Sequence, residues 1–271
     1  MLLEDKNALI YGGGGSIGGA VARTFAREGA KVFLAGRTQA KLEEVAEEIR
    51  SAGGVAETAQ VGALDEKAVD EHADAVAAAT GSVDISFNLI THPSVHGTPM
   101  AEMAVEDYMV SVVTAVRTTF LTARAAARHM IKQGSGVILF FGGSGDPMRD
   151  YYIGGTQVAF EAIESMRRQL SAELGPHGIR AVTLKTGGVP ESIPESVEGR
   201  EEIVERHIVA PAQRGSLADD ARRSRSGGRR RAGTPGRGGP PRRTRERSSP
   251  CPDHASAPPD RRSPRPRPPS G

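Results

Sequence analysis

A run of glycines between Tyr11 and Gly19 constrains the fold of this chain more than any other feature. The apolar segment Ala8–Tyr11 precedes the run, and a segment with helical spacing, Ile17–Glu28, follows it. Glycine adopts positive backbone torsions without strain, and a helix that begins at such a turn offers unpaired N–H groups to an anion. The unit therefore predicts a site for the diphosphate of a dinucleotide. The candidate contacts are Gly12, Gly14, Gly15, Ser16, Ile17 and Gly18.

Beyond the glycine run, short apolar segments alternate with longer segments of helical spacing. Runs that are apolar on both faces and separated by helices are typical of a parallel sheet covered on both sides. We predict an α/β fold, a doubly wound Rossmann-type sheet in three layers with six strands. The expected strands are 8–11, 32–35, 55–61, 85–90, 137–141 and 181–184, and the expected helices are 17–28, 39–52, 66–79, 105–133 and 157–174.

The composition changes abruptly near residue 212. Residues 1–212 carry 19 Lys and Arg against 28 Asp and Glu (net −9), whereas residues 213–271 carry 16 Arg, no Lys and 5 acidic residues (net +11). The second segment has one large aliphatic side chain, Leu217, so it cannot bury enough apolar surface to order itself. We predict a folded domain over 1–212 and a disordered Arg/Pro/Gly/Ser-rich tail over 213–271. Our hypothesis is that a frameshift produced this tail, and resequencing the gene tests it.

Several classes of site are disfavoured by what the sequence lacks. Cys251 is the single cysteine, which excludes an intrachain disulfide and a cysteine-rich metal site. His92 and His96 are four residues apart, but Pro93 argues against the helix that such a metal-binding pair requires, so we expect no metal. The N-terminus shows no secretory signal, and no stretch approaches the roughly 20 apolar residues that span a bilayer. We expect a cytoplasmic protein with a small-molecule substrate and no membrane partner.

The glycine turn resembles that of the short-chain dehydrogenase/reductase family, whose pattern is Thr-Gly-x-x-x-Gly-x-Gly. Tyr11 stands at the Thr position, Gly12 matches, Ser16 replaces the middle glycine, and Ile17-Gly18 match. A serine at this place is similar to the enoyl-reductase branch of the family, and the resemblance covers roughly residues 5–195. It implies an NAD(P)-dependent oxidoreductase acting on a carbonyl, hydroxyl or enoyl group and, for an intact version, a homo-oligomer.

The end of the second predicted strand bears on the choice of cofactor. NAD-selective relatives carry an acidic residue there for the ribose 2′-hydroxyl, whereas this chain reads Gly36-Arg37-Thr38. A guanidinium is a rigid bidentate partner for phosphate, so NADP(H) is favoured over NAD(H). The resemblance also assigns Asn88 to the fourth strand or the adenosine pocket, and the main chain near Gly187 and Val189 to the nicotinamide carboxamide.

The family's proton-transfer residues are a Ser, a Tyr-x-x-x-Lys pair and an Asn, and this chain departs from all four. The lysine matters because a free tyrosine, with a pKa of about 10, is a poor proton carrier near neutrality. Counting outward from Gln169–Leu174 places the four positions on Gly143, Thr156, Phe160 and Ala115. The candidate catalytic residues are then Ser144 and Tyr152, for which simple packing in a loop is the alternative.

Three functions are compatible with these patterns. The first is an NADP(H)-dependent oxidoreductase, and the second is an inactive protein that still binds NADP(H). The third is an α/β domain whose Arg-rich tail binds nucleic acid, which we disfavour because lysine is absent from the tail. Relatives also have a seventh strand with no counterpart here, and an open apolar edge predicts low solubility or weak stability.

Overall fold

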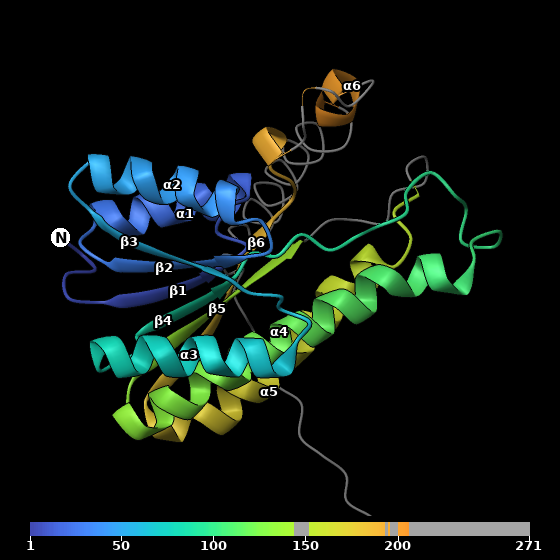
Figure 1. Ribbon diagram of the computed structural model, residues 1–271. Helices are drawn as coiled ribbons and strands as arrows, with labels where there is room; N and C mark the ends of the chain where they lie inside the picture. Colours follow the sequence, from blue (N-terminus) through green and yellow to red (C-terminus); the bar gives the residue numbers. More distant parts are fainter. Residues whose placement is uncertain (144–151, 193–194, 196–199, 206–271) are drawn as a thin grey trace, which may run out of the picture. The chain divides into compact units, whose positions relative to one another are not determined.

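The structure is a computed structural model that describes residues 1–143, 152–192, 195 and 200–205. Within these ranges six parallel strands form one sheet in the order β3-β2-β1-β4-β5-β6 (Figure 1). The strands are β1 (Asn7–Tyr11), β2 (Lys31–Gly36), β3 (Val55–Gln60), β4 (Ile85–Asn88), β5 (Gly136–Gly143) and β6 (Ile179–Thr186). The helices are α1 (Ser16–Arg27), α2 (Gln39–Ser51), α3 (Glu66–Thr80), α4 (Val105–Gln133), α5 (Thr156–Leu174) and α6 (Arg200–Val204), with short 3-10 turns η1 (Gly175–His177) and η2 (Pro190–Ser192).

The predicted doubly wound sheet is confirmed. Every strand and long helix expected from the apolar pattern is present, and β6 extends beyond residues 181–184 at both ends. It was underestimated because Arg180, Thr183 and Lys185 interrupt its apolar run. The boundary near residue 212 and the predicted disorder of the tail lie outside the described residues and stay predictions.

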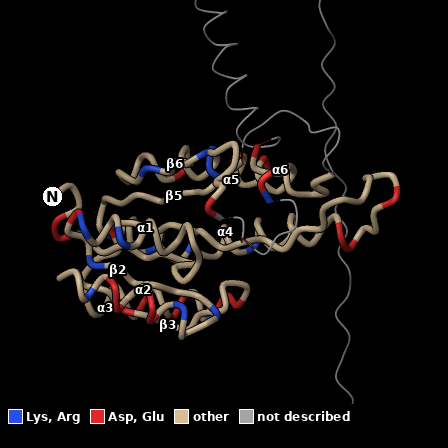
Figure 2. The backbone as a smooth tube through the Cα atoms, turned by 90° about the horizontal axis from the view of Figure 1, so that it is seen from above, with Lys and Arg blue, Asp and Glu red and all other residues tan. Residues whose placement is uncertain are grey.

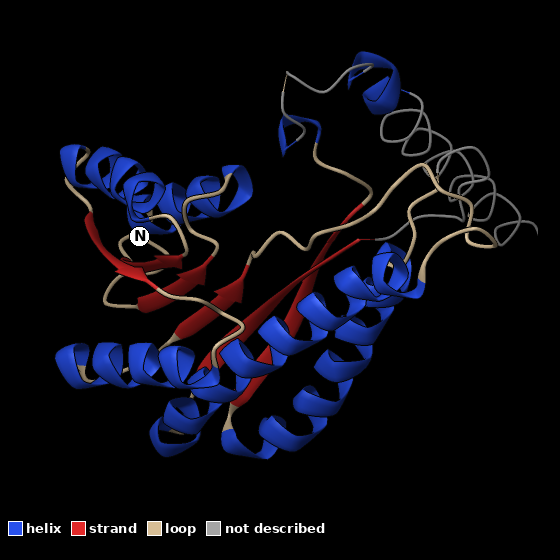
Figure 3. Cartoon of the chain, turned by 45° about the vertical axis from the view of Figure 1, so that its right-hand side comes forward, coloured by secondary structure: helices blue, strands red, loops and turns tan. Residues whose placement is uncertain are grey.

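Alternating side chains of the central strands feed two separate cores. Ala8 and Ile10 of β1 pack with α1 and α2, whereas Leu9 and Tyr11 pack with α3, α4 and α5. All four side chains are essentially inaccessible, and burying a large one stabilises the fold by roughly 1.5–3 kcal/mol. Figure 3 shows the resulting layers, with helices on both sides of the sheet.

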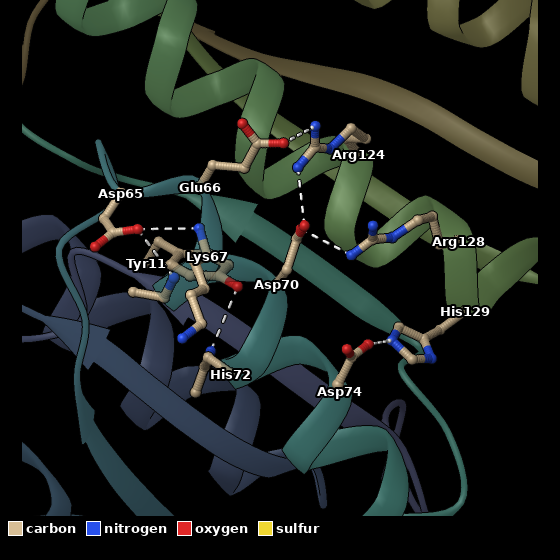
Figure 4. A network of polar contacts seen from close by, with 11 residues as sticks. Tyr11, Asp65, Glu66, Lys67, Asp70, His72, Asp74, Arg124, Arg128 and His129 are labelled. Atoms are coloured by element: carbon tan, nitrogen blue, oxygen red, sulfur yellow. Dashed lines mark hydrogen bonds and ion pairs between the residues drawn. The ribbon is translucent and has the colours of Figure 1, made fainter. Parts of the chain in front are cut away.

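Polar contacts fix α3 against α4 on one face of the sheet (Figure 4). Asp65 begins α3 as its N-cap and accepts hydrogen bonds from the Lys67 and Ala68 N–H groups. Further along, the Asp70 carboxylate lies 2.9 Å from a guanidinium nitrogen of Arg124 and 2.8 Å from one of Arg128. These contacts fix the position of α4 relative to α3.

A second polar cluster fixes α5 to β6. Glu164 accepts hydrogen bonds from Arg167, at 2.8 Å, and from the Thr183 hydroxyl, at 2.7 Å. The Arg167 hydrogen bonds, with those of Thr183 and the charge of Lys185, lower the pKa of Glu164 to about 2. The carboxylate therefore stays charged and ties the outer strand to one helical layer.

Charged residues are frequent along the outer helices, as the blue and red segments of α2 and α3 in Figure 2 show. Arg23 of α1 pairs with Glu48 of α2, and Arg50 pairs with Glu43 and Glu47 within α2. Such exposed pairs contribute little each, about 0–1 kcal/mol, so the apolar cores carry the fold. None of the helices in the described ranges combines the length and apolarity needed to cross a membrane.

Candidate functional site

The sheet reverses its winding direction between β1 and β4. The chain moves from β1 outward through β2 to β3, and it then returns to pair β4 with the other side of β1. Ligands of open α/β sheets bind beyond the carboxyl ends of the strands at such a switch point. The glycine turn leaves β1 at this point, where the Leu89 N–H donates to the Tyr11 carbonyl at 2.8 Å.

The turn has room for main chain only. Gly12 has a φ of +82°, and a Cβ on it would lie 2.5 Å from the Leu89 carbonyl oxygen. A Cβ on Gly18, in the first turn of α1, would lie 2.1 Å from the Gly12 carbonyl oxygen. Glycine is therefore required at both positions, because α1 approaches the turn at backbone contact distance.

The start of α1 is left open toward solvent. Its N-cap is Gly15, which offers no side-chain cap, and no acidic residue occupies its first turn. Gly15 and Ser16 are exposed, while Gly14 lies against Lys41 of α2. The helix thus presents unpaired N–H groups and a partial positive charge. This arrangement fits a diphosphate, so the structure brings the six predicted contact residues into one turn.

Residues at the end of β2 lie on the same edge of the sheet. Arg37 and Thr38 are both exposed, and Thr38 is the N-cap of α2 without a side-chain cap bond. The Arg37 carbonyl accepts a hydrogen bond from Gln60 at 2.9 Å, which fixes the backbone there. Within the described ranges no salt bridge engages the Arg37 guanidinium, so it is free to meet an anion.

Asn88 braces the end of β4 from inside the fold. Its side chain is buried, and its Oδ1 accepts the Ile90 N–H at 3.0 Å. Its Nδ2 lies 3.3 Å from the Thr122 hydroxyl on α4. Of the two roles that the sequence left open, these contacts support bracing of the strand. A contact of Asn88 with the cofactor stays a prediction.

Tyr11, at the Thr position of the family pattern, points away from the glycine turn. Its ring is buried on the α3 side of the sheet, with its hydroxyl 3.4 Å from Nδ1 of His72 (Figure 4). Burial and the nearby charge of Asp70 raise the pKa of Tyr11 far above its usual value. Burial also lowers the pKa of His72 to about 4. The pair is neutral near pH 7 and serves packing.

The other end of the site, at the carboxyl end of β5, is built differently. A Cβ on Gly143 would lie 2.5 Å from Cε2 and 2.7 Å from Cδ2 of the Phe160 ring on α5. The His92 ring lies 6.4 Å from the same ring between centroids, and burial lowers the pKa of His92 to about 4. Ala115 of α4 is fully buried. An apolar aromatic group therefore fills the space beside the end of β5.

The loop after β6 returns to the glycine turn. The Thr186 hydroxyl accepts the Gly188 N–H at 3.0 Å, which closes a tight turn around Gly187. Val189 and Ile17 both line a pocket of about 390 Å³ between α1 and η2. The predicted positions near the nicotinamide and near the diphosphate are thus brought to one edge of the sheet.

Comparison with known proteins decides the family. The family model described as enoyl-(acyl carrier protein) reductase matches residues 13–222. This chain belongs to the short-chain dehydrogenase/reductase family. It is 30% identical over 219 residues to an L-rhamnose 1-dehydrogenase (NAD(P)(+)) of Azotobacter vinelandii, covering 76% of this chain and 83% of that protein. It is 28% identical over 200 residues to the uncharacterized oxidoreductase YxbG of Bacillus subtilis, covering 74% and 72%.

Solved structures agree with this assignment. A metagenomic short-chain oxidoreductase in complex with NADP superposes with a TM-score of 0.63 at 26% identity, covering 70% of this chain and 85% of that one. A short-chain type dehydrogenase/reductase from Mycobacterium marinum gives 0.64 at 28% identity, covering 76% and 87%. The chain is therefore a short-chain oxidoreductase by fold and by sequence.

The family's proton-transfer positions can now be placed. Thr156 is the first residue of α5, and its Oγ1 is buried without a hydrogen-bond partner among the described residues. Tyr152 is 41% exposed, and its carbonyl accepts the Gly97 N–H at 2.8 Å. Ser144 lies outside the described residues. Among those described, no group of three His, Cys, Asp or Glu side chains could hold a metal ion.

Sequence reasoning located Gly143 and Phe160 but missed that they depend on each other. The contact joins residues 17 positions apart on a strand and a helix, and no local pattern reveals it. It also missed the outer flank of α1 as a pocket wall, although Ile17, Val21 and Phe25 recur at helical spacing. That spacing was the available signal.

Proposed function

We propose that this chain is an NADP(H)-dependent oxidoreductase that transfers a hydride to or from a carbonyl, hydroxyl or enoyl carbon of a small molecule. The observation that carries the proposal is the open start of α1 above a turn in which Gly12 and Gly18 admit no side chain. When bound, NADPH would supply the hydride for reduction and NADP+ would accept it in oxidation. The chain's own part is to hold the diphosphate with main-chain N–H groups and to orient the nicotinamide end near Val189.

Arg37 supports the choice of NADP(H) over NAD(H). Its guanidinium is exposed at the end of β2, where an acidic residue would instead accept a ribose hydroxyl. A relative with NADP bound and another named for both cofactors are compatible with this choice. Gly187 and Val189 are our candidates for the carboxamide contact, Thr38 for a 2′-phosphate contact, and Asn88 for a brace beside the adenosine.

The experiment for the cofactor is a fluorescence titration of wild type and Arg37→Glu with NADPH and NADH. We expect the variant to lose about 10-fold or more of its NADPH affinity, the cost of one charge-assisted phosphate contact, while NADH affinity changes little. Arg27→Glu makes the same charge change at the far end of α1 and is the control. Equal losses for both nucleotides would contradict the assignment.

Proton transfer is assigned to Tyr152, with Ser144 as its partner on the substrate oxygen. We expect Tyr152→Phe to lower NADPH consumption by about 100-fold with an active substrate from a panel of ketones and enoyl thioesters. Its NADPH affinity should be unchanged, because the hydroxyl is not part of the glycine turn. Wild-type rates of NADPH consumption in the variant would show that Tyr152 does not transfer the proton.

A second function is favoured by one observation, the ring of Phe160 against Gly143. In this alternative the chain binds NADP(H) without turning a substrate over. Tight NADPH binding combined with no consumption across the whole panel would select it. In either case we propose a cytoplasmic protein with a small-molecule partner, homo-oligomeric in an intact version.

A further inference from the structure

His92 lies in the loop after β4, at the edge of the sheet that carries the candidate site. The chain leaves β4 in backbone contact with the glycine turn, because a Cβ on Gly12 would lie 2.5 Å from the Leu89 carbonyl oxygen. Three residues later, the His92 ring lies 6.4 Å between centroids from the ring of Phe160. The same phenyl ring lies against Gly143 at the end of β5. These contacts connect His92 to both ends of the site.

The loop that carries His92 is fixed to the segment that precedes α5. The Gly97 N–H donates to the Tyr152 carbonyl at 2.8 Å. A Cβ on Gly154 would lie 2.9 Å from the Val95 carbonyl oxygen, so the two segments touch through their backbones. The imidazole of His92 and the phenol of Tyr152, our candidate for proton transfer, therefore belong to two neighbouring segments at the same end of the fold.

The His92 imidazole has no polar partner among the described residues. Within those ranges no hydrogen bond or ion pair engages either ring nitrogen. Burial lowers the pKa of His92 to about 4, so the ring is neutral near pH 7. A neutral imidazole has one N–H donor and one acceptor nitrogen. Both are available to a ligand.

Packing alone is a poor account of a histidine at this position. The ring that it faces is the phenyl group of Phe160, and a polar ring in apolar surroundings without a hydrogen bond costs free energy that an apolar side chain would avoid. His72 has such a partner, since its Nδ1 lies 3.4 Å from the Tyr11 hydroxyl. A ligand that brings an oxygen atom would supply the partner that His92 lacks.

We propose that His92 is a further catalytic residue, whose neutral ring donates an N–H hydrogen bond to the carbonyl oxygen of the substrate. This role rests on the oxidoreductase function proposed above. The oxygen of a substrate carbonyl gains negative charge when hydride adds to the carbon, and a donor fixed beside it stabilises that charge. His92 neither gains nor loses a proton in the step.

The electrons and protons balance with the groups already assigned. In a ketone, hydride from the reduced nicotinamide forms the new C–H bond, and the π-electron pair of the C=O bond moves to the oxygen. The proton of Tyr152 completes the alcohol, and the nicotinamide is left oxidised. In an enoyl thioester the hydride adds to the β carbon, the thioester oxygen takes up the electron pair as an enolate, and the proton ends on the α carbon.

The test uses two substitutions that separate packing from hydrogen bonding. His92→Phe keeps a ring against Phe160 and removes the donor, whereas His92→Gln keeps an N–H donor and removes the ring. With the ketone or enoyl thioester that wild type reduces fastest, we expect His92→Phe to lower kcat by about 100-fold and His92→Gln by less than about 10-fold. NADPH affinity should be unchanged in both. His177→Phe, at an exposed histidine of η1, is the control and should keep the wild-type kcat.

A second measurement uses the wild-type chain and requires no turnover. Diethyl pyrocarbonate acylates neutral imidazole, and mass spectrometry of the peptides measures the extent at each histidine. With NADP+ and the same ketone or enoyl thioester both present, no hydride is available for reduction. We expect the acylation of His92 to be largely lost under these conditions, and that of His177 to be unchanged.

The outcomes separate this proposal from the function on which it rests. A wild-type kcat in His92→Phe, or a loss in His92→Gln that equals or exceeds the loss in His92→Phe, would overturn the role of His92 and leave the oxidoreductase function intact. Equal acylation of His92 with and without the substrate would also overturn it. No NADPH consumption by wild type with any member of the panel would contradict the oxidoreductase function, and the role of His92 with it.

Discussion

The two ends of the candidate site are the glycine turn, proposed to hold the diphosphate, and the reacting end beside β5. They differ in whether main-chain or side-chain atoms carry the chemistry. At the diphosphate end, Gly12 and Gly18 are fixed by contacts with backbone atoms, and the chemistry resides in main-chain N–H groups. At the reacting end, beside β5, the chemistry of the family resides in side chains, and counting from Gln169–Leu174 predicts Gly143, Thr156, Phe160 and Ala115 at those positions.

The difference teaches how far each kind of chemistry tolerates substitution. A backbone cradle survives changes in most side chains around it, because any residue supplies an N–H group and only the glycines are constrained. A proton relay depends on single side chains, because the tyrosine works best beside an ammonium group, and our candidate Tyr152 would have to work without one. The Phe160 ring leaves no room for a serine side chain at position 143, so replacing Gly143 by serine alone would not restore the residue found there in the family.

The largest expected effect concerns the diphosphate end. Gly18→Val places a Cβ about 2.1 Å from the Gly12 carbonyl oxygen, so α1 must move away from the turn. We expect NADPH affinity to fall by about 100-fold or more, as several main-chain hydrogen bonds are lost together. The control is Gly175→Ala, where an added Cβ would have nothing within 4 Å and φ is −52°. Unchanged NADPH affinity in Gly18→Val would show that the glycine turn tolerates a side chain, which contradicts the proposed role of the turn.

The next effect concerns the reacting end. Gly143→Ser overpacks the site against Phe160, and we expect it to lower the free energy of unfolding by about 2 kcal/mol in urea titrations. In a Phe160→Ala background the same serine should cost far less, because the ring is gone. Additive effects of the two substitutions would show that the two residues are not coupled.

The smallest effect is a pH dependence beneath the diphosphate end. Burial lowers the pKa of His72 from 6.5 to about 4, so the unfolded chain binds its proton first as pH falls. Stability from neutral His72 is complete above about pH 6.5 and is lost as pH falls toward 4.

We expect wild type to lose roughly 1–2 kcal/mol more than His72→Gln between about pH 7 and pH 4.5. Urea titrations at the two pH values measure the difference. His177→Gln, a change at an exposed histidine of η1, is the control and should follow wild type. Identical pH profiles for wild type and His72→Gln would show that His72 does not contribute to the pH dependence of the free energy of unfolding.

Prediction from sequence succeeded where the signal is local. The strand–turn–helix unit at Ala8–Glu28 and the helix α3 that begins at Glu66 depend on residues within one or two turns of each other. It did not reveal that Phe160 packs against Gly143, because this contact joins β5 to α5, which are distant in the sequence. Similarly, Asn88 was left between two roles until its hydrogen bond to Ile90 and its approach to Thr122 were visible.

The sequence by itself determined the class of fold and the position of the glycine turn, and it predicts a diphosphate site at that turn and the loss of the family's Tyr-x-x-x-Lys pair. Periodicity, glycine spacing and residue identity are properties of the linear chain. Only the tertiary structure decided that Phe160 fills the space beside Gly143, and that Val189 shares a pocket with the flank of α1. Both depend on which distant side chains share a volume, and close packing settles that question in three dimensions.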